Sequence, residues 1–491
     1  MSNIVGLSFG FHDAAACLID NGEILFAGHS ERYTKKKHDK ELSYSLIDDL
    51  KSYTTGPIST IAYYENPWLK DLRRLVTGEY VYKDPVPVTK TIKSHFDTRW
   101  YKTYSHHKSH AAAGFATSPF ESAAVLVIDA IGEFDTVSIW KAWVGVNGHC
   151  HYRKIDSIKY PHSLGLTYSA FTDRVGLKPM DEEYILMGMA AYGKPNFANR
   201  IKNEIINVNK VKFKNIKNCH TGLGNWPFEG ASHEDLAASI QQVTEDAVAR
   251  LADYALTITQ ETNLVYMGGV ALNCVANSRL GSLGNIWIMP CPGDAGSSLG
   301  AAALAYGKKL NWQNAYLGHN IGSNYPVQKL FNALLSKQIV GVASGRAEFG
   351  PRALGNRSLL ADPRGHDIKD RVNEIKRRQK FRPFAPAILA EMADQYFDMP
   401  PGWHHSPYMQ SVARCRQPDL TPAICHADGT SRVQTVGADG SGLRQLLELW
   451  YKQTGCPMLL NTSLNIRWEP MVNDRYDADR FEQKYGVHVF S

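Results

Sequence analysis

Two stretches of the chain follow one plan, in which a short apolar strand is followed by a polar turn and a β-hairpin. Residues 4–28 contain the apolar runs IVGLSFG, AAACLI and EILFAG, separated by FHD and DNG. Residues 123–154 repeat that order with AAVLVID, TVSIWKAWVGV and HCHYRKI, and an Asn-Gly pair precedes the last run. Turns of these types are strong hairpin signals. The pattern predicts a duplicated α/β unit, although two unrelated meanders would leave the same pattern.

The segments that follow the repeat also alternate strands with helices. Residues 234–262 carry apolar side chains at the spacing of a helix. LVYMGGVALNCVANSRL and WIMPCPGDAGSSLGAAALAYG each read as a strand, a glycine-bearing turn and the start of a helix. A duplicated unit of this kind is typical of actin-like ATPases, in which the turns of both halves face a nucleotide and a metal ion. Residues 311–328 are polar and contain Gly, Asn and Pro, so we place a boundary there and expect a second α/β region after it.

Composition narrows the class of protein. The longest apolar runs are the length of strands, so we expect no membrane span. The N-terminus does not have the pattern of a signal peptide. The eight cysteines form no CxxC pair, which suits a reducing cytoplasm. The net charge of +6 is concentrated in TKKKHDK and KRRQKFR. These two segments are either solvated basic faces or sites for anions such as phosphate.

Four side chains from distant segments are candidate metal ligands. His106 and His110 are four residues apart, so a helix places both imidazoles on one face. Asp129 closes an apolar strand, and Asp294 lies at a strand-to-helix turn, where open α/β sheets hold ligands. Two imidazoles and two carboxylates suit Fe(II), Mn(II) or Zn(II). Paired histidines are also common in packing or at the surface, and Asp129 could simply cap a turn.

Turn residues of the first region suggest acid–base and anion-binding roles. His12 lies in the first hairpin turn, where an imidazole could take the proton of an acceptor hydroxyl, or could be structural. Gly268 and Gly269 precede a predicted helix, and we place Asn273 on its first turn. Glycines let a ligand approach the backbone, and helix N-termini favour anions. A tight strand-to-helix turn would explain the same residues.

The second region concentrates arginine and lysine beside Phe and Pro. GRAEFGPRALGNRS and KRRQKFRPFAP supply guanidinium groups that match planar oxyanions. NTSLN, at 461–465, offers hydroxyl and amide donors for a phosphate. Each segment taken singly could also be a solvated face or loop.

Together these motifs resemble the NodU/CmcH/TobZ family of O-carbamoyltransferases. The resemblance extends over nearly the whole chain in family order. Its matching segments are FHDAAACLIDNGEILFAGHSERYTKKKHD, HHKSHAAAGFATSPFESAAVLVIDAIGE, EEYILMGMAAYG, GGVALNCVANSRL, PCPGDAGSSLGAA, GRAEFGPRALGNRSLLADPR, KFRPFAPAIL, RVQTV and NTSLN. It implies an α/β protein with a duplicated actin-like domain over 1–325 and a YrdC-like α/β domain over 326–491.

The resemblance also implies a chemistry. ATP, with Mg²⁺, and carbamoyl phosphate would give carbamoyladenylate in the second domain, and the first domain would pass the carbamoyl group to a hydroxyl. A divalent metal, with Fe²⁺ favoured over Mn²⁺ or Zn²⁺, would be held by His106, His110, Asp129 and Asp294. His12 would be the general base, and Lys37 would bind the anion. Nucleotide ligands would be Gly268, Gly269 and Asn273. Ligands for ATP and carbamoyl phosphate would be Arg352, Lys376, Arg382, Arg432, Ser463 and Asn465.

The acceptor does not follow from the resemblance. We expect a small hydroxyl compound, and the basic balance leaves room for a hydroxymethylated pyrimidine nucleotide. We expect a cytoplasmic enzyme without a membrane or nucleic-acid partner, and a homodimer is compatible with the sequence. Two other hypotheses are a tRNA-modifying threonylcarbamoyl-type enzyme, which would need a wide basic surface, and a non-enzymatic actin-like nucleotide sensor. The sensor would leave the metal quartet and the arginine-rich second region unexplained.

Overall fold

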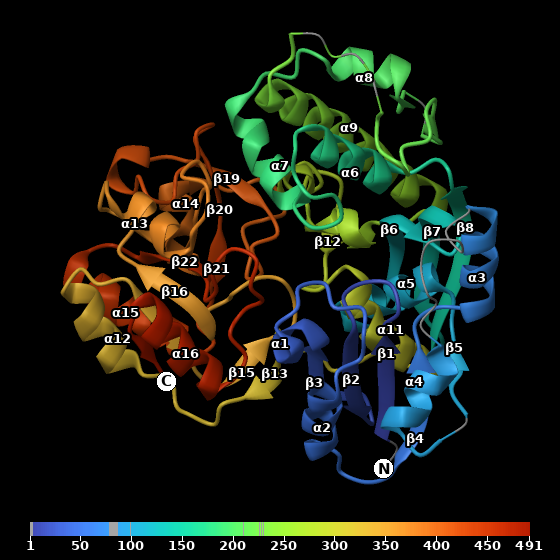
Figure 1. Ribbon diagram of the computed structural model, residues 1–491, viewed down its shortest axis with the longest axis horizontal. Coiled ribbons are helices and arrows are strands. Elements are labelled where there is room, and N and C mark those ends of the chain that lie inside the picture. The colour runs from blue at the N-terminus through green and yellow to red at the C-terminus, as the bar shows by residue number, and fades with distance from the viewer. Residues whose placement is uncertain are drawn as a thin grey trace. The chain divides into compact units, whose positions relative to one another are not determined.

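The computed structural model describes residues 3–77, 87–98, 100–209, 211–224, 226, 228 and 230–491 (Figure 1). The chain divides into two compact units. Unit 1 comprises Met1–Thr34, His38–Asn273 and Leu283–Asn314. Unit 2 comprises Lys35–Lys37, Cys274–Ser282 and Ala315–Ser491. Two short segments, Lys35–Lys37 and Cys274–Ser282, therefore group with the C-terminal residues although their neighbours in sequence belong to unit 1.

The first sheet of unit 1 has the strand order β3-β2-β1-β4-β5. Its strands are β1 (Asn3–Ser8), β2 (Ala15–Asp20), β3 (Glu23–His29), β4 (Ile58–Tyr63) and β5 (Lys102–Thr103). β1, β2 and β3 form an antiparallel meander, and β4 and β5 continue parallel to β1. The runs IVGLSFG, AAACLI and EILFAG are thus the three strands that the sequence predicts.

The second sheet repeats this topology. Its order is β12-β11-β6-β7-β8, with an antiparallel β6–β7–β8 meander and with β11 and β12 parallel to β6. Its strands are β6 (Ser122–Gly132), β7 (Asp135–Val144), β8 (Cys150–Lys159), β11 (Asn263–Met267) and β12 (Asn285–Trp287). Both sheets share one order and one set of strand directions, so the repeat in the sequence is present as a repeat of topology.

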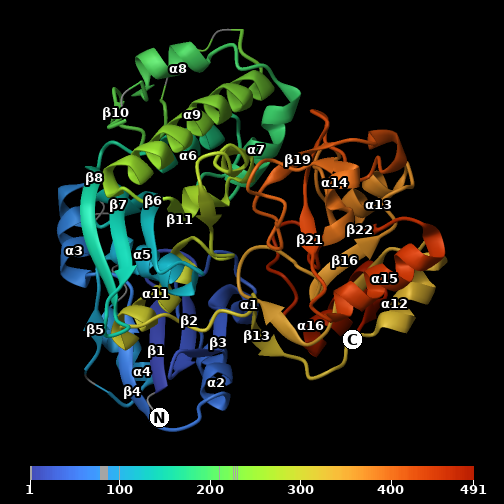
Figure 2. The ribbon, with the colours of Figure 1, turned by 180° about the vertical axis from the view of Figure 1, so that it is seen from behind.

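A layer of two helices lies between the two sheets. α5 (His106–Thr117) packs on β6 and β11, while α11 (Asp294–Tyr306) packs on β1, β2 and β4, and the two helices contact each other (Figures 1 and 2). Small residues make the approach close. A Cβ on Gly300 of α11 would lie 1.8 Å from the carbonyl oxygen of Ser109 in α5. The alanine- and glycine-rich sequences of the two helices are therefore what brings their N-terminal residues together.

Some of the remaining helices of unit 1 pack on the sheets, and others pack on one another. α9 (His233–Thr259) packs on β6 and β7 and is the long helix that the sequence predicts over 234–262. Ser232 caps it by accepting a hydrogen bond from the Asp235 amide. The other helices are α1 (Ser30–Thr34), α2 (Tyr44–Ser52), α3 (Pro67–Val76), α4 (Val88–His95), α6 (Leu164–Arg174), α7 (Glu183–Met189) and α8 (Ala198–Glu204). A small ladder joins β9 (Ile206–Asn207) to β10 (Lys214–Asn215).

Unit 2 is built on a six-stranded sheet with the order β21-β17-β22-β16-β14-β23. These strands are β14 (Val340–Ala343), β16 (Arg357–Ala361), β17 (Ala385–Leu389), β21 (Gln434–Val436), β22 (Met458–Ser463) and β23 (Val489–Phe490). Shorter sheets pair β13 (Tyr316–Asn320) with β15 (Arg346–Glu348), and β19 (Val412–Cys415) with β18 (Phe397–Asp398) and β20 (Thr430–Arg432). Its helices are α10 (Cys274–Ser278), α12 (Val327–Leu335), α13 (Ile368–Ile375), α14 (Ala393–Tyr396), α15 (Gly442–Thr454) and α16 (Arg475–Tyr485).

The predicted α/β class is confirmed, because both units combine sheets with helices. Within the described part of the chain, every helix falls short of the length or the apolar character that a bilayer crossing requires.

One glycine should be indispensable to the turn after β11. Gly268 has φ +93° and ψ 167°, a conformation that is open almost only to glycine, and an added Cβ would lie 2.2 Å from the Ile128 carbonyl oxygen. Gly148 has φ +76° with nothing near its Cβ position, so it isolates the cost of the conformation. We expect Gly148→Ala to lower the free energy of unfolding by about 1–2 kcal/mol. Gly268→Ala should lower it by at least about 3 kcal/mol. Chemical denaturation of both variants would show this, and equal losses would contradict it.

Candidate functional site

Two of the three histidines in HHKSH face a common point. His106 and His110 lie in the first turns of α5, only 2% and 0% exposed, and their Nε2 atoms are 3.1 Å apart. The predicted helical presentation of this pair is therefore present. His107 points elsewhere, with Nδ1 2.8 Å from the hydroxyl oxygen of Ser138 in β7. Burial, together with the charge of His106, holds the pKa of His107 well below its usual value.

Asp129 is positioned by an irregularity in β6. The sequence predicts that the strand ends at Asp129, but β6 continues to Gly132, and its register with β7 shifts between Ile128 and Gly132. The backbone of Asp129 thus lies outside the regular pairing of β6 with β7. Oδ1 accepts a hydrogen bond of 3.0 Å from the Gly269 amide, and Oδ2 lies 3.2 Å from Nε2 of His106. The turn after β11 therefore orients this carboxylate.

Asp294 is the first residue of α11 and completes the cluster. Oδ1 lies 3.3 Å from Nε2 of His106 and 3.4 Å from Nε2 of His110. Both carboxylate oxygens are buried, and neither has a hydrogen-bond partner of acceptable geometry among the described residues. A buried carboxylate left in this state costs free energy unless another group compensates its charge.

The four donors fit a divalent metal ion. One atom from each of His106, His110, Asp129 and Asp294 lies within 4.8 Å of the others, and the recorded separations run from 3.1 to 3.8 Å. Four ligands at tetrahedral corners, each about 2.1 Å from a central ion, lie about 3.4 Å from one another. The mixed nitrogen and oxygen donors suit Fe(II), Mn(II) or Zn(II).

The pKa shifts of His106 and Asp294 also fit a site for a cation. Burial opposes the charged form of His106, but the charge of Asp294 and the hydrogen bond to Asp129 hold its pKa well above its usual value. Burial likewise disfavours the carboxylate of Asp294, and the charges of His106 and His12 nevertheless keep its pKa well below normal. The buried carboxylates thus favour positive charge beside them.

The sequence did not reveal the groups around His106. Glu65 is 3% exposed, and its Oε1 lies 3.6 Å from Nδ1 of His106, while Lys70 donates to its Oε2 at 2.6 Å. Glu133 Oε1 accepts hydrogen bonds from the backbone amides of Asn66 and His106, at 2.8 and 3.3 Å. Glu65 follows the end of β4, so the signal that singled out Asp129 could also have found it.

His12 lies beside the cluster, as the sequence suggested for a residue of the β1–β2 turn. Its Nε2 is 3.8 Å from Oδ2 of Asp294, and its Nδ1 is 2.8 Å from Oδ2 of Asp13. Burial lowers the pKa of His12, but the charge of Asp294 and the hydrogen bond to Asp13 outweigh it and raise the pKa to about 9.

The glycine turn differs in detail from its prediction. Gly269 begins a short 3₁₀ helix, Gly269–Leu272, and Asn273 follows that helix instead of lying on its first turn. The Asn273 side chain exchanges two hydrogen bonds with Gln241 of α9, at 2.9 and 3.1 Å. The pair fixes the orientation of the Asn273 amide.

In unit 2, several predicted anion ligands meet at Lys376. This lysine is 3% exposed, and its Nζ donates to the carbonyl oxygen and Oδ1 of Asn465, at 2.8 and 2.9 Å, and to Oγ of Ser463 at 3.2 Å. Burial lowers its pKa well below the usual value, and the positive charges of Arg378, Arg382 and Lys37 add to that effect. The positive charges of Arg378, Arg382 and Lys37 therefore act on the Lys376 ammonium group.

Two other predicted ligands lie in the loop after β15 and at the end of β20. Arg352 is half-buried in the loop after β15. Arg432 ends β20, and its Nε is buried without a hydrogen-bond partner among the described residues.

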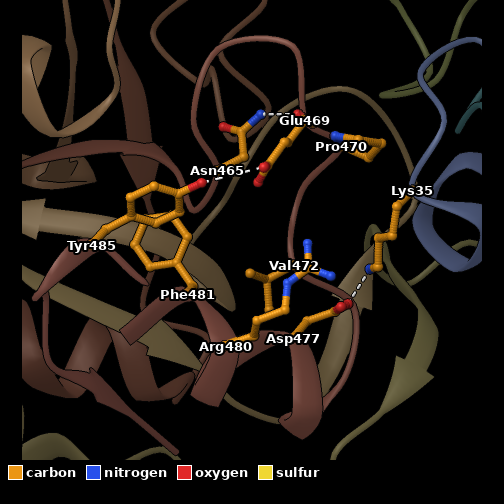
Figure 3. A pocket seen from close by; sticks show the side chains of 9 residues that line it. All are labelled: Lys35, Asn465, Glu469, Pro470, Val472, Asp477, Arg480, Phe481 and Tyr485. Atoms are coloured by element: carbon orange, nitrogen blue, oxygen red, sulfur yellow. Dashed lines mark hydrogen bonds and ion pairs between the residues drawn. The ribbon is translucent and has the colours of Figure 1, made fainter. Parts of the chain in front are cut away.

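Unit 2 has an open pocket that is lined in part by Asn465 (Figure 3). The Asn465 side chain also accepts a hydrogen bond from Lys376. Asn465 donates from Nδ2 to the carbonyl oxygen of Glu469 at 2.6 Å, and Tyr485 donates to the Glu469 carboxylate at 3.2 Å. On the opposite wall Lys35 is paired with Asp477. The pocket is lined by Lys35, Asn465, Glu469, Pro470, Val472, Asp477, Arg480, Phe481 and Tyr485.

Both halves of the chain match family models of the same kind of protein. Residues 73–303 match the family model of the carbamoyltransferase N-terminus, and residues 331–490 match that of the carbamoyltransferase C-terminus. An uncharacterized protein of Synechocystis is 34% identical over 98% of this chain and 94% of its own length.

Two named relatives are also similar over most of the chain. The nodulation protein NolNO of Sinorhizobium fredii is 31% identical over 95% of this chain and 76% of its own length. The 3'-hydroxymethylcephem-O-carbamoyltransferase of Amycolatopsis lactamdurans is 27% identical over 97% of this chain and 95% of its own length.

The four residues His106, His110, Asp129 and Asp294 form what we call the metal-type cluster. Its ability to bind a metal ion can be tested with a control variant from the same helix. We expect the purified chain to take up one equivalent of Zn²⁺ or Fe²⁺, and His110→Ala to weaken that affinity by more than about 100-fold, because it removes a direct ligand. His107→Ala deletes a neighbouring buried imidazole that faces Ser138 and should retain the metal. Elemental analysis after dialysis, with isothermal titration, gives both values. Equal metal loss in the two variants would show that the cluster is not the ligand set.

Proposed function

Because the chain belongs to the carbamoyltransferase family, we propose that it is an ATP-dependent O-carbamoyltransferase that carries out two reactions in sequence. The observation that best supports this proposal is that the chain contains two groups of buried charged residues with different chemistry. Unit 1 has a buried cluster of imidazoles and carboxylates suited to a metal ion. Unit 2 has the buried Lys376, on which the positive charges of Arg378, Arg382 and Lys37 act. This concentration of positive charge suits phosphate-bearing substrates.

The first reaction is assigned to unit 2. Carbamoyl phosphate reacts with water to give carbamate and phosphate, and a carbamate oxygen then bonds to the α-phosphorus of ATP while pyrophosphate leaves. The products are carbamoyladenylate, phosphate and pyrophosphate. Lys37, Lys376 and Arg382 supply positive charge for the phosphoryl oxygens. Lys376 also fixes Ser463 and Asn465, so it organises the loop in addition to carrying charge. Arg352 and Arg432 are assigned to the same substrates by the family resemblance.

The second reaction is assigned to unit 1. The acceptor hydroxyl gives its proton to Nε2 of His12, its oxygen bonds to the carbamoyl carbon, and AMP leaves with the electron pair of the broken carbon–oxygen bond. His106, His110, Asp129 and Asp294 would hold the divalent ion, which when bound polarises the carbamoyl carbonyl and neutralises the two carboxylates. Those carboxylates raise the pKa of His12, so their neutralisation favours its proton-accepting form.

The nucleotide part of the intermediate is assigned to the turn after β11. Gly268 and Gly269 leave the backbone open to close approach, while Asn273 presents an amide that Gln241 holds in place. The repeated 3-2-1-4-5 strand order of unit 1 supports an actin-like domain, for which we propose residues 1–325. For residues 326–491 we propose a YrdC-like domain.

The acceptor is proposed as a small molecule bearing a primary hydroxyl. The name of the Amycolatopsis relative specifies a hydroxymethyl group as its acceptor. A hydroxymethylated pyrimidine nucleotide combines such a group with a phosphate, which suits a chain of net charge +6.

Two variants separate the two reactions. With ATP and carbamoyl phosphate, we expect pyrophosphate release that depends on carbamoyl phosphate. Lys376→Met should lower that release at least about 100-fold, because it removes a buried charge from the proposed anion site. Lys452→Met replaces an exposed lysine of α15 and should not change it. His110→Ala should keep the release within about twofold yet abolish the mass increase of one carbamoyl group on 5-hydroxymethylcytidine monophosphate or another alcohol.

Each outcome decides one part of the proposal. A wild-type chain that releases no pyrophosphate with carbamoyl phosphate contradicts the adenylate step. Normal transfer by His110→Ala contradicts the role of the cluster. Thermal unfolding of the Lys376→Met protein distinguishes lost chemistry from lost folding.

A further inference from the structure

A continuous hydrogen-bonded chain of imidazoles and carboxylates extends from His12 away from the metal-type cluster. Asp13 Oδ2 is 2.8 Å from Nδ1 of His12, and Asp13 Oδ1 is 2.8 Å from Nδ1 of His38. Nε2 of His38 is 3.0 Å from Oδ1 of Asp181, whose other oxygen is 3.0 Å from Nζ of Lys178. All of these residues belong to unit 1, and they come from three separate segments of the chain.

The backbone is shaped to make these contacts. Asp13 and His38 both have left-handed backbones, with φ of 52° each. Such conformations cost free energy for residues other than glycine and persist where the surroundings enforce them, often at functional sites. The His38 amide also donates to Glu31 at 3.1 Å. The turn after β1 and the turn after α1 thus aim their side chains at each other.

The hydrogen-bond chemistry fixes the protonation pattern. An ionised carboxylate only accepts hydrogen bonds. Both ring nitrogens of His38 face carboxylate oxygens, so both carry hydrogen and His38 is an imidazolium. The pKa of His38 agrees, because its hydrogen bonds to Asp13 and Asp181 overcome the effect of burial and raise it to about 10. Asp13 then accepts from His38 on one oxygen and from Nδ1 of His12 on the other.

We propose that Asp13, His38 and Asp181 are positioning residues that hold His12 as its Nδ1–H tautomer, with the proton-accepting Nε2 turned toward Asp294. This inference rests on the proposed function, in which Nε2 of His12 takes the acceptor's proton. During that step Nδ1 keeps its hydrogen, and the imidazolium that forms is stabilised by Asp13. His38 keeps Asp13 from rotating away, and Asp181 anchors His38. We call Asp13, His38 and Asp181 the positioning relay. No proton passes along this relay, so none of these three residues changes its charge.

A readout that does not require activity tests the tautomer directly. Protein labelled with ¹⁵N-histidine and loaded with diamagnetic Zn²⁺ reports ring tautomers by NMR, and a His12→Gln sample assigns the His12 signals. We expect a single Nδ1–H form in the wild type, the Nε2–H form in Asp13→Asn, and a mixture in His38→Ala. His38→Gln can still donate to Asp13 and should restore most of the wild-type signal. His404→Ala removes an exposed imidazole paired with Asp394 and should leave His12 unchanged.

Transfer to 5-hydroxymethylcytidine monophosphate supplies the second readout. Asp13→Asn should lower kcat by about 100-fold or more, and His38→Ala by about 10-fold, with KM for the acceptor unchanged. Pyrophosphate release by unit 2 should stay at the wild-type level in both. A His38→Ala protein with wild-type His12 tautomer overturns the inference. So does loss of a second equivalent of bound Zn²⁺ in His38→Ala, because Asp13, Glu31 and His38 would then be a cation site.

The two proposals fail separately. If the wild type transfers no carbamoyl group while the tautomer shifts as expected, the proposed function fails and the positioning relay stands. If transfer occurs and the tautomer does not respond to Asp13→Asn, the relay fails and the proposed function stands.

Discussion

Close packing of α5 against α11 is the constraint on which the candidate site of unit 1 depends. Small residues line the contact, and a Cβ at Gly300 would overlap the Ser109 carbonyl oxygen at 1.8 Å. The approach places His106 and His110, at the start of one helix, within 3.4 Å of Asp294, at the start of the other. A wider helix pair would separate these atoms by more than a metal–ligand geometry allows. The second sheet supplies the fourth side chain, Asp129, at the irregularity of β6.

Charge compensation explains why both units carry buried ionisable groups. In unit 1, Asp294 and Asp129 are buried beside the imidazoles of His106 and His110, and the pKa of His106 is raised accordingly. In unit 2 the sign is reversed, because Lys376 is buried among Arg378, Arg382 and Lys37. Buried charge of this kind is costly unless a partner neutralises it. A cation in the first site and phosphate groups in the second would neutralise each, which is the electrostatic basis of the proposed division of labour.

His12 links acid–base chemistry to this arrangement. One ring nitrogen faces Asp294 at 3.8 Å, while the other is committed to Asp13 at 2.8 Å. In the proposed function His12 is a general base, which needs one nitrogen held as a donor so that the other remains an acceptor, and Asp13 of the β1–β2 turn is placed to hold that donor. The stretch TKKKHDK divides between the units, because Lys35–Lys37 group with unit 2 and His38 with unit 1.

The sequence by itself determined the elements and the ligand types. Hairpin turns and apolar runs predicted both meanders, and the four-residue spacing of His106 and His110 predicted their shared helical face. A predicted strand end marked Asp129, although β6 continues to Gly132, and a predicted strand-to-helix turn marked Asp294. Only the tertiary structure decided which polar groups meet. Sequence order does not show that Glu65 lies beside His106, that Gln241 holds Asn273, or that Asp181 reaches His38 from 143 residues away. Those contacts depend on how the sheets and helices pack, and long-range packing leaves no periodic trace in a single chain.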